Sequence, residues 1–182
     1  MRILKTVIIM VLIACGTLFS HPHLFIESSI EPVIEGNNLK GIRIYWEFDK
    51  YWSEEVITEC DTDRNGILDR QEIGLVFKDF FNDLRYSNYF TELIVNGRRR
   101  SVTGVEAFHA EIIKDNIIVY DFVVPVNADL SQGLKLSVLF NDDTIYTAFD
   151  QKVGLKDNKY HPVKSMEVSG NGWYGVRIDL EF

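Results

Sequence analysis

The chain has 182 residues, of which 46% are hydrophobic and 25% are charged, a composition typical of one globular domain. This composition excludes disordered, collagen-like and low-complexity proteins. The formal net charge is −8, from 19 lysine and arginine residues against 27 aspartate and glutamate residues. The clearest basic cluster is Arg98-Arg99-Arg100, so nucleic acid is not an expected partner.

The first twenty residues have the pattern of a secretory signal peptide. Arg2 and Lys5 precede an uncharged, strongly apolar stretch at 6–19. This stretch is too short to cross a bilayer, which needs about 20 apolar residues. The alternative is a buried N-terminal strand or helix. We expect export, to the periplasm or to the medium.

Two cleavage sites are compatible with this segment. Cleavage after Ser20 would make His21 the first residue of a single domain at 21–182 and would change the net charge to −10. Alternatively, Leu12-Ile13-Ala14-Cys15 fits a bacterial lipobox, and the chain would then be anchored to a membrane through a lipid on Cys15. We favour cleavage after Ser20, which leaves Cys60 as a lone thiol that cannot form an internal disulfide.

The first clear strand pattern runs from Leu39 to Phe48. Apolar and polar side chains alternate over this stretch, which predicts a half-buried strand. The turn residues 35–38 join it to a preceding strand, and strands joined by short turns pair antiparallel. The expected core face carries Ile42, Ile44, Trp46 and Phe48.

Between residues 51 and 85 the hydrophobic period becomes helical, which predicts a helical insert in the β domain. A short helix is expected at 53–60, with Ser53 as its N-cap. A second helix is expected at 70–84. Its apolar stripe is formed by Ile73, Val76, Phe77, Phe80 and Leu84.

The loop between these helices, residues 61–72, has the spacing of a calcium site. Gly66 stands where the loop turns sharply, and oxygen-bearing side chains occupy loop positions 1, 3, 5, 9 and 12. This pattern resembles the EF-hand loop. An acidic solvated turn is the alternative, and a loop without a paired partner predicts weak binding, at about 10⁻⁴–10⁻³ M, with a structural role. The predicted ligands are Asp61, Asp63, Asn65, the Ile67 carbonyl, Asp69 and both oxygens of Glu72.

The residues after the insert return to a β pattern. Asn96-Gly97 is a strong hairpin signal, and the β-branched run at 117–124 predicts a central strand. Alternating patterns follow at 134–140 and 174–182. The fold is therefore expected to be mainly β (α+β), an antiparallel β-sandwich or curled meander with an inserted helix–calcium loop–helix.

Two of the four histidines, His21 and His23, flank a proline directly after the favoured cleavage site. A freed amine and two imidazoles suit a late transition metal, with zinc expected first and copper or nickel second. The alternative is a pair of solvated surface histidines. His109 is expected in the core or on a sheet edge and His161 on the surface, and either could complete the metal shell.

Several segments together are similar to one exported bacterial family, catalogued as domain of unknown function one-thousand-and-seven. They are His21–Glu27 after a signal peptide, Trp46-Glu47-Phe48-Asp49, the acidic helical insert, and Asp143-Thr144-Ile145-Tyr146. The resemblance covers essentially the whole mature chain. It implies a periplasmic protein beside uncharacterised transport systems, often those for nickel, cobalt or zinc. It also implies that His21, His23 and Asp49 form the site.

Three functions follow from these patterns. The favoured one is a calcium-binding, metal-handling accessory of an inner-membrane transporter. The second is a structural or interaction module in which calcium acts as a staple. The third, a copper-dependent oxidoreductase that uses an N-terminal histidine, is the one enzymatic alternative, because the sequence lacks the common hydrolase, zinc-protease and phosphate-loop motifs. We expect the protein not to be an enzyme.

Overall fold

The structure is a computed structural model that describes residues 23–144, 146–150, 154–155, 163–170 and 175–182. Its strands are β1 (Leu24–Glu35), β2 (Asn38–Phe48), β3 (Thr91–Val95), β4 (Arg98–Ser101), β5 (Glu106–Ile113), β6 (Ile117–Asp129), β7 (Lys135–Phe140), β8 (Thr147–Phe149), β9 (Gly154–Leu155), β10 (Ser165–Gly170) and β11 (Val176–Glu181). The helices are α2 (Lys50–Cys60) and α3 (Arg70–Val76), and helical turns follow at Phe77–Phe81, Asn82–Phe90 and Lys114–Asn116.

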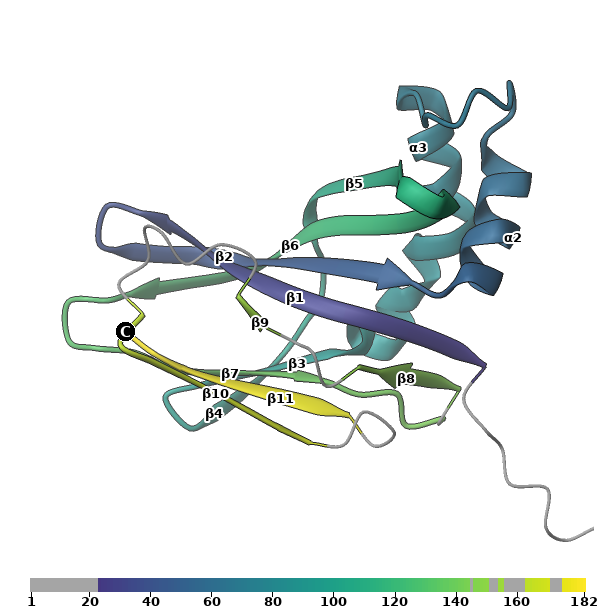
Figure 1. Cartoon of the computed structure of the whole chain (residues 1–182). Coiled ribbons are helices and arrows are strands. Elements are labelled where there is room, and N and C mark those ends of the chain that lie inside the picture. The colour runs from purple at the N-terminus through teal and green to yellow at the C-terminus, as the bar shows by residue number, and fades with distance from the viewer. Residues whose placement is uncertain (1–22, 145, 151–153, 156–162, 171–174) are drawn as a thin grey trace, which may run out of the picture.

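The described strands form two sheets that face each other, with the helices at one end (Figure 1). Sheet A has the order β5-β6-β2-β1-β8, with β9 also paired to β1, and sheet B has the order β10-β11-β7-β3-β4. The predicted mainly β fold with a helical insert is confirmed. One difference is that β1 pairs in parallel with β8 and β9. The chain enters β8 from β7 of sheet B rather than through a hairpin with β1, so the antiparallel rule for short turns does not apply to this pairing.

The predicted strands and turns agree with the structure where it describes them. The alternating stretch 39–48 lies in β2, which pairs with β1 on one side and β6 on the other. Asn96 and Gly97 both have positive φ, +48° and +78°, as a tight hairpin between β3 and β4 requires. The run at 117–124 lies in β6, an interior strand of sheet A.

Trp46 lies at the centre of the core. Its fully buried indole meets Phe122 of β6 edge-on, with ring centroids 4.8 Å apart. From β2 it also reaches sheet B, because Phe140 of β7 is 6.5 Å away. Phe149 of β8 lies at 6.1 Å and Phe81 of the helical insert at 6.5 Å. One aromatic side chain therefore contacts both sheets and the insert.

The first helix begins earlier than the sequence predicts. Asp49, not Ser53, is the N-cap of α2, and its Oδ1 accepts the backbone N–H groups of Tyr51 and Trp52 at 2.8 and 3.0 Å. Ser53 lies one turn inside the helix and is fully buried. Its hydroxyl donates to the Asp49 carbonyl at 2.7 Å and accepts the Ile118 N–H at 3.0 Å, which fastens α2 to β6. Aspartate and serine are both favoured N-cap residues. Asp49 takes this position because Ser53 is buried against the sheet and its hydroxyl bonds to β6.

The second helix is less regular than the predicted 70–84. The α-helical part ends at Val76, and a π-helical turn follows at Phe77–Phe81. A π turn inserts about one extra residue, so the apolar stripe shifts along the sequence. Phe81 becomes fully buried against Phe108, at 4.4 Å between ring centroids, whereas Phe77 is 37% exposed.

Replacement of Asp49 tests its role as the N-cap. Asp49→Ala should lower the free energy of unfolding by about 1–2 kcal/mol, because the first N–H groups of α2 lose their acceptor. Asp49→Asn keeps one capping oxygen for α2 but loses the acceptor of the Phe25 N–H, so it should cost less than Asp49→Ala. Urea denaturation of the three proteins gives the comparison. Equal losses for the two variants would show that the bond to the Phe25 N–H or the charge, rather than the cap, matters.

Candidate metal centre

The loop between α2 and α3 projects from the end of the molecule away from both sheets (Figure 1). It begins at Asp61, the C-cap of α2, and ends at Asp69, the N-cap of α3. The chain reverses between them with positive φ at Arg64, +59°, and at Gly66, +77°. A glycine adopts this conformation at little cost, which explains its place at the sharpest turn.

Three acidic side chains converge inside this loop. One carboxylate oxygen each from Asp61, Asp63 and Glu72 lies within 4.8 Å of the other two. Asp61 and Glu72 are only 5% and 4% exposed. Like charges at this spacing repel one another, and a divalent cation would remove that repulsion. Among the residues that the structure describes, these are the one group of three such side chains that could hold a metal ion.

Backbone hydrogen bonds orient the oxygen atoms in the first half of the loop. Asp61 Oδ2 accepts the Gly66 N–H at 2.9 Å. Asp63 Oδ1 accepts the Asn65 N–H at 3.1 Å, and Asn65 Oδ1 accepts the Ile67 N–H at 2.7 Å. Each of these oxygens keeps a second lone pair for a further partner.

Glu72 is held as a carboxylate by bonds from both ends of the loop. Its Oε2 accepts the Asp69 N–H at 3.0 Å, and its Oε1 accepts the N–H and the hydroxyl of Thr62, both at 2.8 Å. These bonds lower the pKa of Glu72, and the largest part of that lowering comes from the Asp69 N–H. The side chain is therefore ionised at neutral pH, as a metal ligand must be.

Asp69 differs from the other predicted calcium ligands because its carboxylate caps α3. Its Oδ1 accepts the N–H groups of Gln71 and Glu72 at 2.7 and 2.9 Å, and together with Glu72 it forms a capping box at the start of α3. It does not belong to the group of three converging carboxylates. Asn65 is joined to that group, because its Nδ2 donates to Asp63 Oδ2 at 2.8 Å.

Two further residues, Thr62 and Cys60, shape the site without being predicted ligands. Thr62, at loop position 2, fixes Glu72 through two bonds, and only the closed loop reveals this. Cys60 is buried beside Asp61, and burial, with nearby carboxylates, raises the pKa of its thiol to about 11. A neutral thiol in such a place packs as an apolar side chain rather than as a metal ligand.

A second region lies where β1 begins. The N–H groups of His23 and Leu24 donate to the Tyr146 carbonyl at 2.8 and 3.2 Å, and the His23 ring lies 5.3 Å from that of Tyr146. Asp49 Oδ2 accepts the Phe25 N–H at 2.8 Å. Three segments far apart in the sequence therefore meet at one corner of the molecule, which we call the β1 corner.

The predicted transition-metal residues are only partly described. His23 is exposed at the β1 corner, and Asp49 is joined to it through Phe25. His21 and His161 lie outside the described residues, so the site of His21, His23 and Asp49 stays a prediction. His109 is exposed on the edge strand β5, as the edge interpretation expects.

The loop before β8 is fixed by Asp142, which the sequence did not single out as a site residue. Its Oδ1 accepts the N–H and hydroxyl of Thr144 at 2.9 and 2.6 Å, and its Oδ2 accepts the Thr147 N–H at 2.9 Å. Burial opposes its ionisation, but these bonds outweigh burial and lower its pKa. The carboxylate thereby orders the segment that presents the Tyr146 carbonyl.

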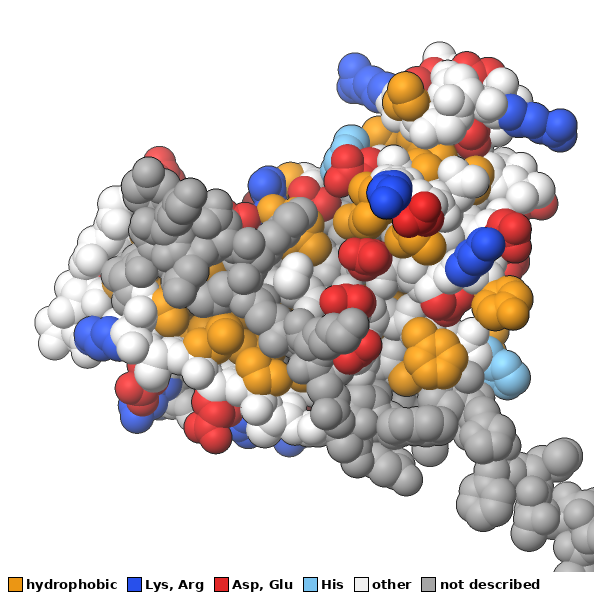
Figure 2. Space-filling model, viewed as in Figure 1, with side chains coloured by type: hydrophobic (Ala, Val, Ile, Leu, Met, Phe, Trp, Pro, Cys, Tyr) orange, Lys and Arg blue, Asp and Glu red, His pale blue; other side chains and the backbone are white. Residues whose placement is uncertain are grey.

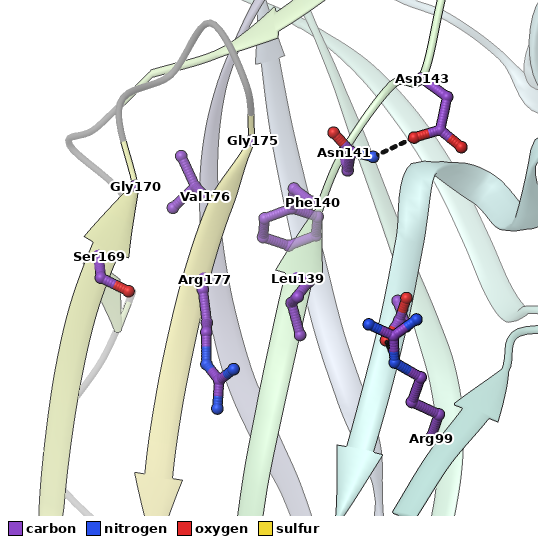
Figure 3. Close-up of a pocket in the computed structure, with 11 residues that line it drawn as sticks. Arg99, Leu139, Phe140, Asn141, Asp143, Ser169, Gly170, Gly175, Val176 and Arg177 are labelled. Atoms are coloured by element: carbon purple, nitrogen blue, oxygen red, sulfur yellow. Dashed lines mark hydrogen bonds and ion pairs between the residues drawn. The ribbon is translucent and has the colours of Figure 1, made fainter.

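A pocket of about 490 Å³ opens at one end of sheet B (Figure 3). Arg99 and Arg177 line it, and each has a carboxylate partner, Glu92 at 3.0 Å and Asp179 at 2.8 Å. Asp143 accepts a bond of 2.5 Å from the Asn141 side chain there. Because these charges are already paired, the pocket is a weaker candidate site than the loop.

Comparison with known proteins places the chain among uncharacterised relatives. A family model described as Protein of unknown function (DUF1007) matches residues 6–164. The chain is also similar to an uncharacterized 15.5 kDa protein in the trpE 3' region of Spirochaeta aurantia, at 30% identity over 123 residues, which cover 68% of this chain and 82% of the relative. No solved structure matches the chain, and within the described residues no helix is long and apolar enough to span a bilayer. Because the family model matches most of the sequence, the chain belongs to the family Protein of unknown function (DUF1007).

Proposed function

We propose that the protein is an exported calcium-binding protein that acts as a metal-handling accessory of an inner-membrane transporter. The observation that carries the calcium part is the convergence of Asp61, Asp63 and Glu72 within 4.8 Å of one another in a loop that joins two helices. The transport part rests on the resemblance of the N-terminal histidine segment to the family and stays an expectation.

The donor set fits Ca²⁺ better than a transition metal. Every candidate donor in the loop is an oxygen, from carboxylates, an amide and a backbone carbonyl, and calcium takes six to eight oxygen ligands. Asp61, Asp63 and Asn65 would supply side-chain oxygens, and Ile67 its carbonyl. Glu72 would supply two oxygens, of which Oε1 would exchange the Thr62 hydroxyl for the ion. Asp69 would act through its Oδ2, directly or through water, since its Oδ1 already caps α3. A bound Ca²⁺ would neutralise the converging carboxylates and hold α2 and α3 together.

A structural staple is the second candidate function, and the anchoring of α2 favours it. Asp49 caps this helix at the sandwich, Ser53 bonds to β6, and Asp61 ends it at the loop. An ion bound in the loop would therefore rigidify an element that is already fixed at its other end. In this alternative His21 and His23 are solvated and bind no metal.

Calcium should stabilise the folded protein, and Glu72→Ala should remove the effect. With Ca²⁺ at one hundred times the dissociation constant, the free energy of unfolding should rise by about 2.7 kcal/mol. Glu72→Ala takes away two ligand oxygens, so its melting temperature should not respond to calcium. The matched control is Glu54→Ala, an exposed glutamate of α2 outside the loop, which should respond like the natural protein. Equal melting temperatures of the natural protein in calcium and in chelator would contradict the proposal.

The processed chain should bind one late transition metal through its N-terminus. The freed amine and the imidazoles of His21 and His23 must lose protons to coordinate, so zinc affinity should fall as the pH drops below about 6.5. Calorimetric titration with zinc and then copper, with calcium saturating, measures this. The His21→Ala/His23→Ala variant provides the comparison, and indistinguishable isotherms would leave the structural staple as the better function.

A further inference from the structure

The tip of the candidate calcium loop exposes an apolar side chain between two basic ones. Ile67 is 70% exposed, and Arg64 and Arg70 on either side of it are exposed as well. Figure 2 shows basic and hydrophobic side chains together on this projecting part of the surface. Within the described residues, neither arginine forms an ion pair.

The exposure of Ile67 is not explained by the calcium site itself. The loop position that Ile67 occupies offers a backbone carbonyl to the ion, so any side chain would serve there. The neighbouring Leu68, 7% exposed, supplies the apolar contact with the core. An exposed isoleucine at the tip therefore adds apolar surface that neither the fold nor the ion requires.

A bound cation would change the charge that the tip presents. Residues 61–72 contain four carboxylates and two arginines, a net charge of −2, and one Ca²⁺ brings this to zero. The three carboxylates that converge would face the ion, whereas the exposed Asp69 and the two arginines would remain outside that group of three. The calcium-loaded tip would then offer two guanidinium groups and an apolar side chain to an anionic surface.

We propose that this tip docks on a lipid surface with anionic headgroups when calcium is bound. The side chains that make the contact are Arg64, Ile67 and Arg70. The inference rests on the proposed calcium site. Ile67 enters the interfacial region, and the two arginines bind headgroup phosphates. A lipid surface is favoured over a second copy of the chain because the tip is small. A stable dimer buries roughly 800 Å² per partner, which three side chains on a projecting loop cannot supply.

Co-sedimentation with vesicles tests the proposal. The chain from His21 onward, which carries no lipid, is mixed with vesicles of phosphatidylcholine that contain about one-third phosphatidylglycerol, in calcium or in chelator. Calcium should raise the bound fraction at least about fivefold, and the gain should shrink when salt is raised or phosphatidylglycerol is omitted. Ile67→Ser should weaken vesicle binding about tenfold.

Matched variants separate this proposal from its alternatives. Met166→Ser, an exposed apolar residue on β10, should bind vesicles like the natural protein, whereas Arg64→Gln/Arg70→Gln should bind more weakly. Calcium binding, followed by calorimetry without lipid, should be unchanged in Ile67→Ser, because the side chain is not a ligand. If the natural protein binds no calcium, the proposed calcium site itself fails. If it binds calcium but not vesicles, or forms a calcium-dependent dimer without lipid, the docking proposal alone is overturned.

Discussion

The carboxylate of Asp49 connects the sandwich to the helical insert, and both candidate metal regions depend on that connection. One oxygen begins α2 by accepting the N–H groups of Tyr51 and Trp52, and the other accepts the N–H of Phe25 in β1. The 11 residues of α2 then lead directly to Asp61, the first residue of the loop. At 1.5 Å per residue, the helix places the β1 corner and the loop about 16 Å apart along its axis. The start of β1 and the helix that leads to Asp61 are therefore joined through one side chain.

The insert is fixed on the sandwich by contacts that do not involve any ion. The Ser53 hydroxyl bonds to Ile118, and the Phe81 ring packs on Phe108 and lies within 6.5 Å of Trp46. Buried contacts of this kind are stronger than the exposed ion pairs of the sheets, which contribute little each. The loop is consequently presented at the end of two anchored helices, so that the convergence of its carboxylates does not depend on the ion alone.

Sequence patterns predicted the features that depend on neighbouring residues. Alternation located β2, the Asn-Gly pair located a hairpin, and twelve consecutive residues sufficed to place Asp61, Asp63 and Glu72 close together. Features that depend on distant residues could not be predicted in this way. The choice of Asp49 over Ser53 as N-cap depends on β6, and the parallel pairing of β1 with β8 depends on a crossover between sheets. The π-helical turn ends at Phe81, whose ring packs on Phe108 of β5, a contact that the local hydrophobic period does not reveal.

The two candidate metal regions offer different chemistry, so they would not compete for one ion. The loop presents oxygen atoms alone, which suit a hard cation such as Ca²⁺, whereas the β1 corner presents the imidazole of His23, which suits zinc, copper or nickel. Asp49 already accepts three backbone N–H groups at the corner, and its main role there is to hold β1 and α2 in place. A metal site at the corner would therefore depend chiefly on nitrogen ligands. Calcium could then saturate the loop without occupying the nitrogen ligands, and the choice of transition metal would be made at the corner alone.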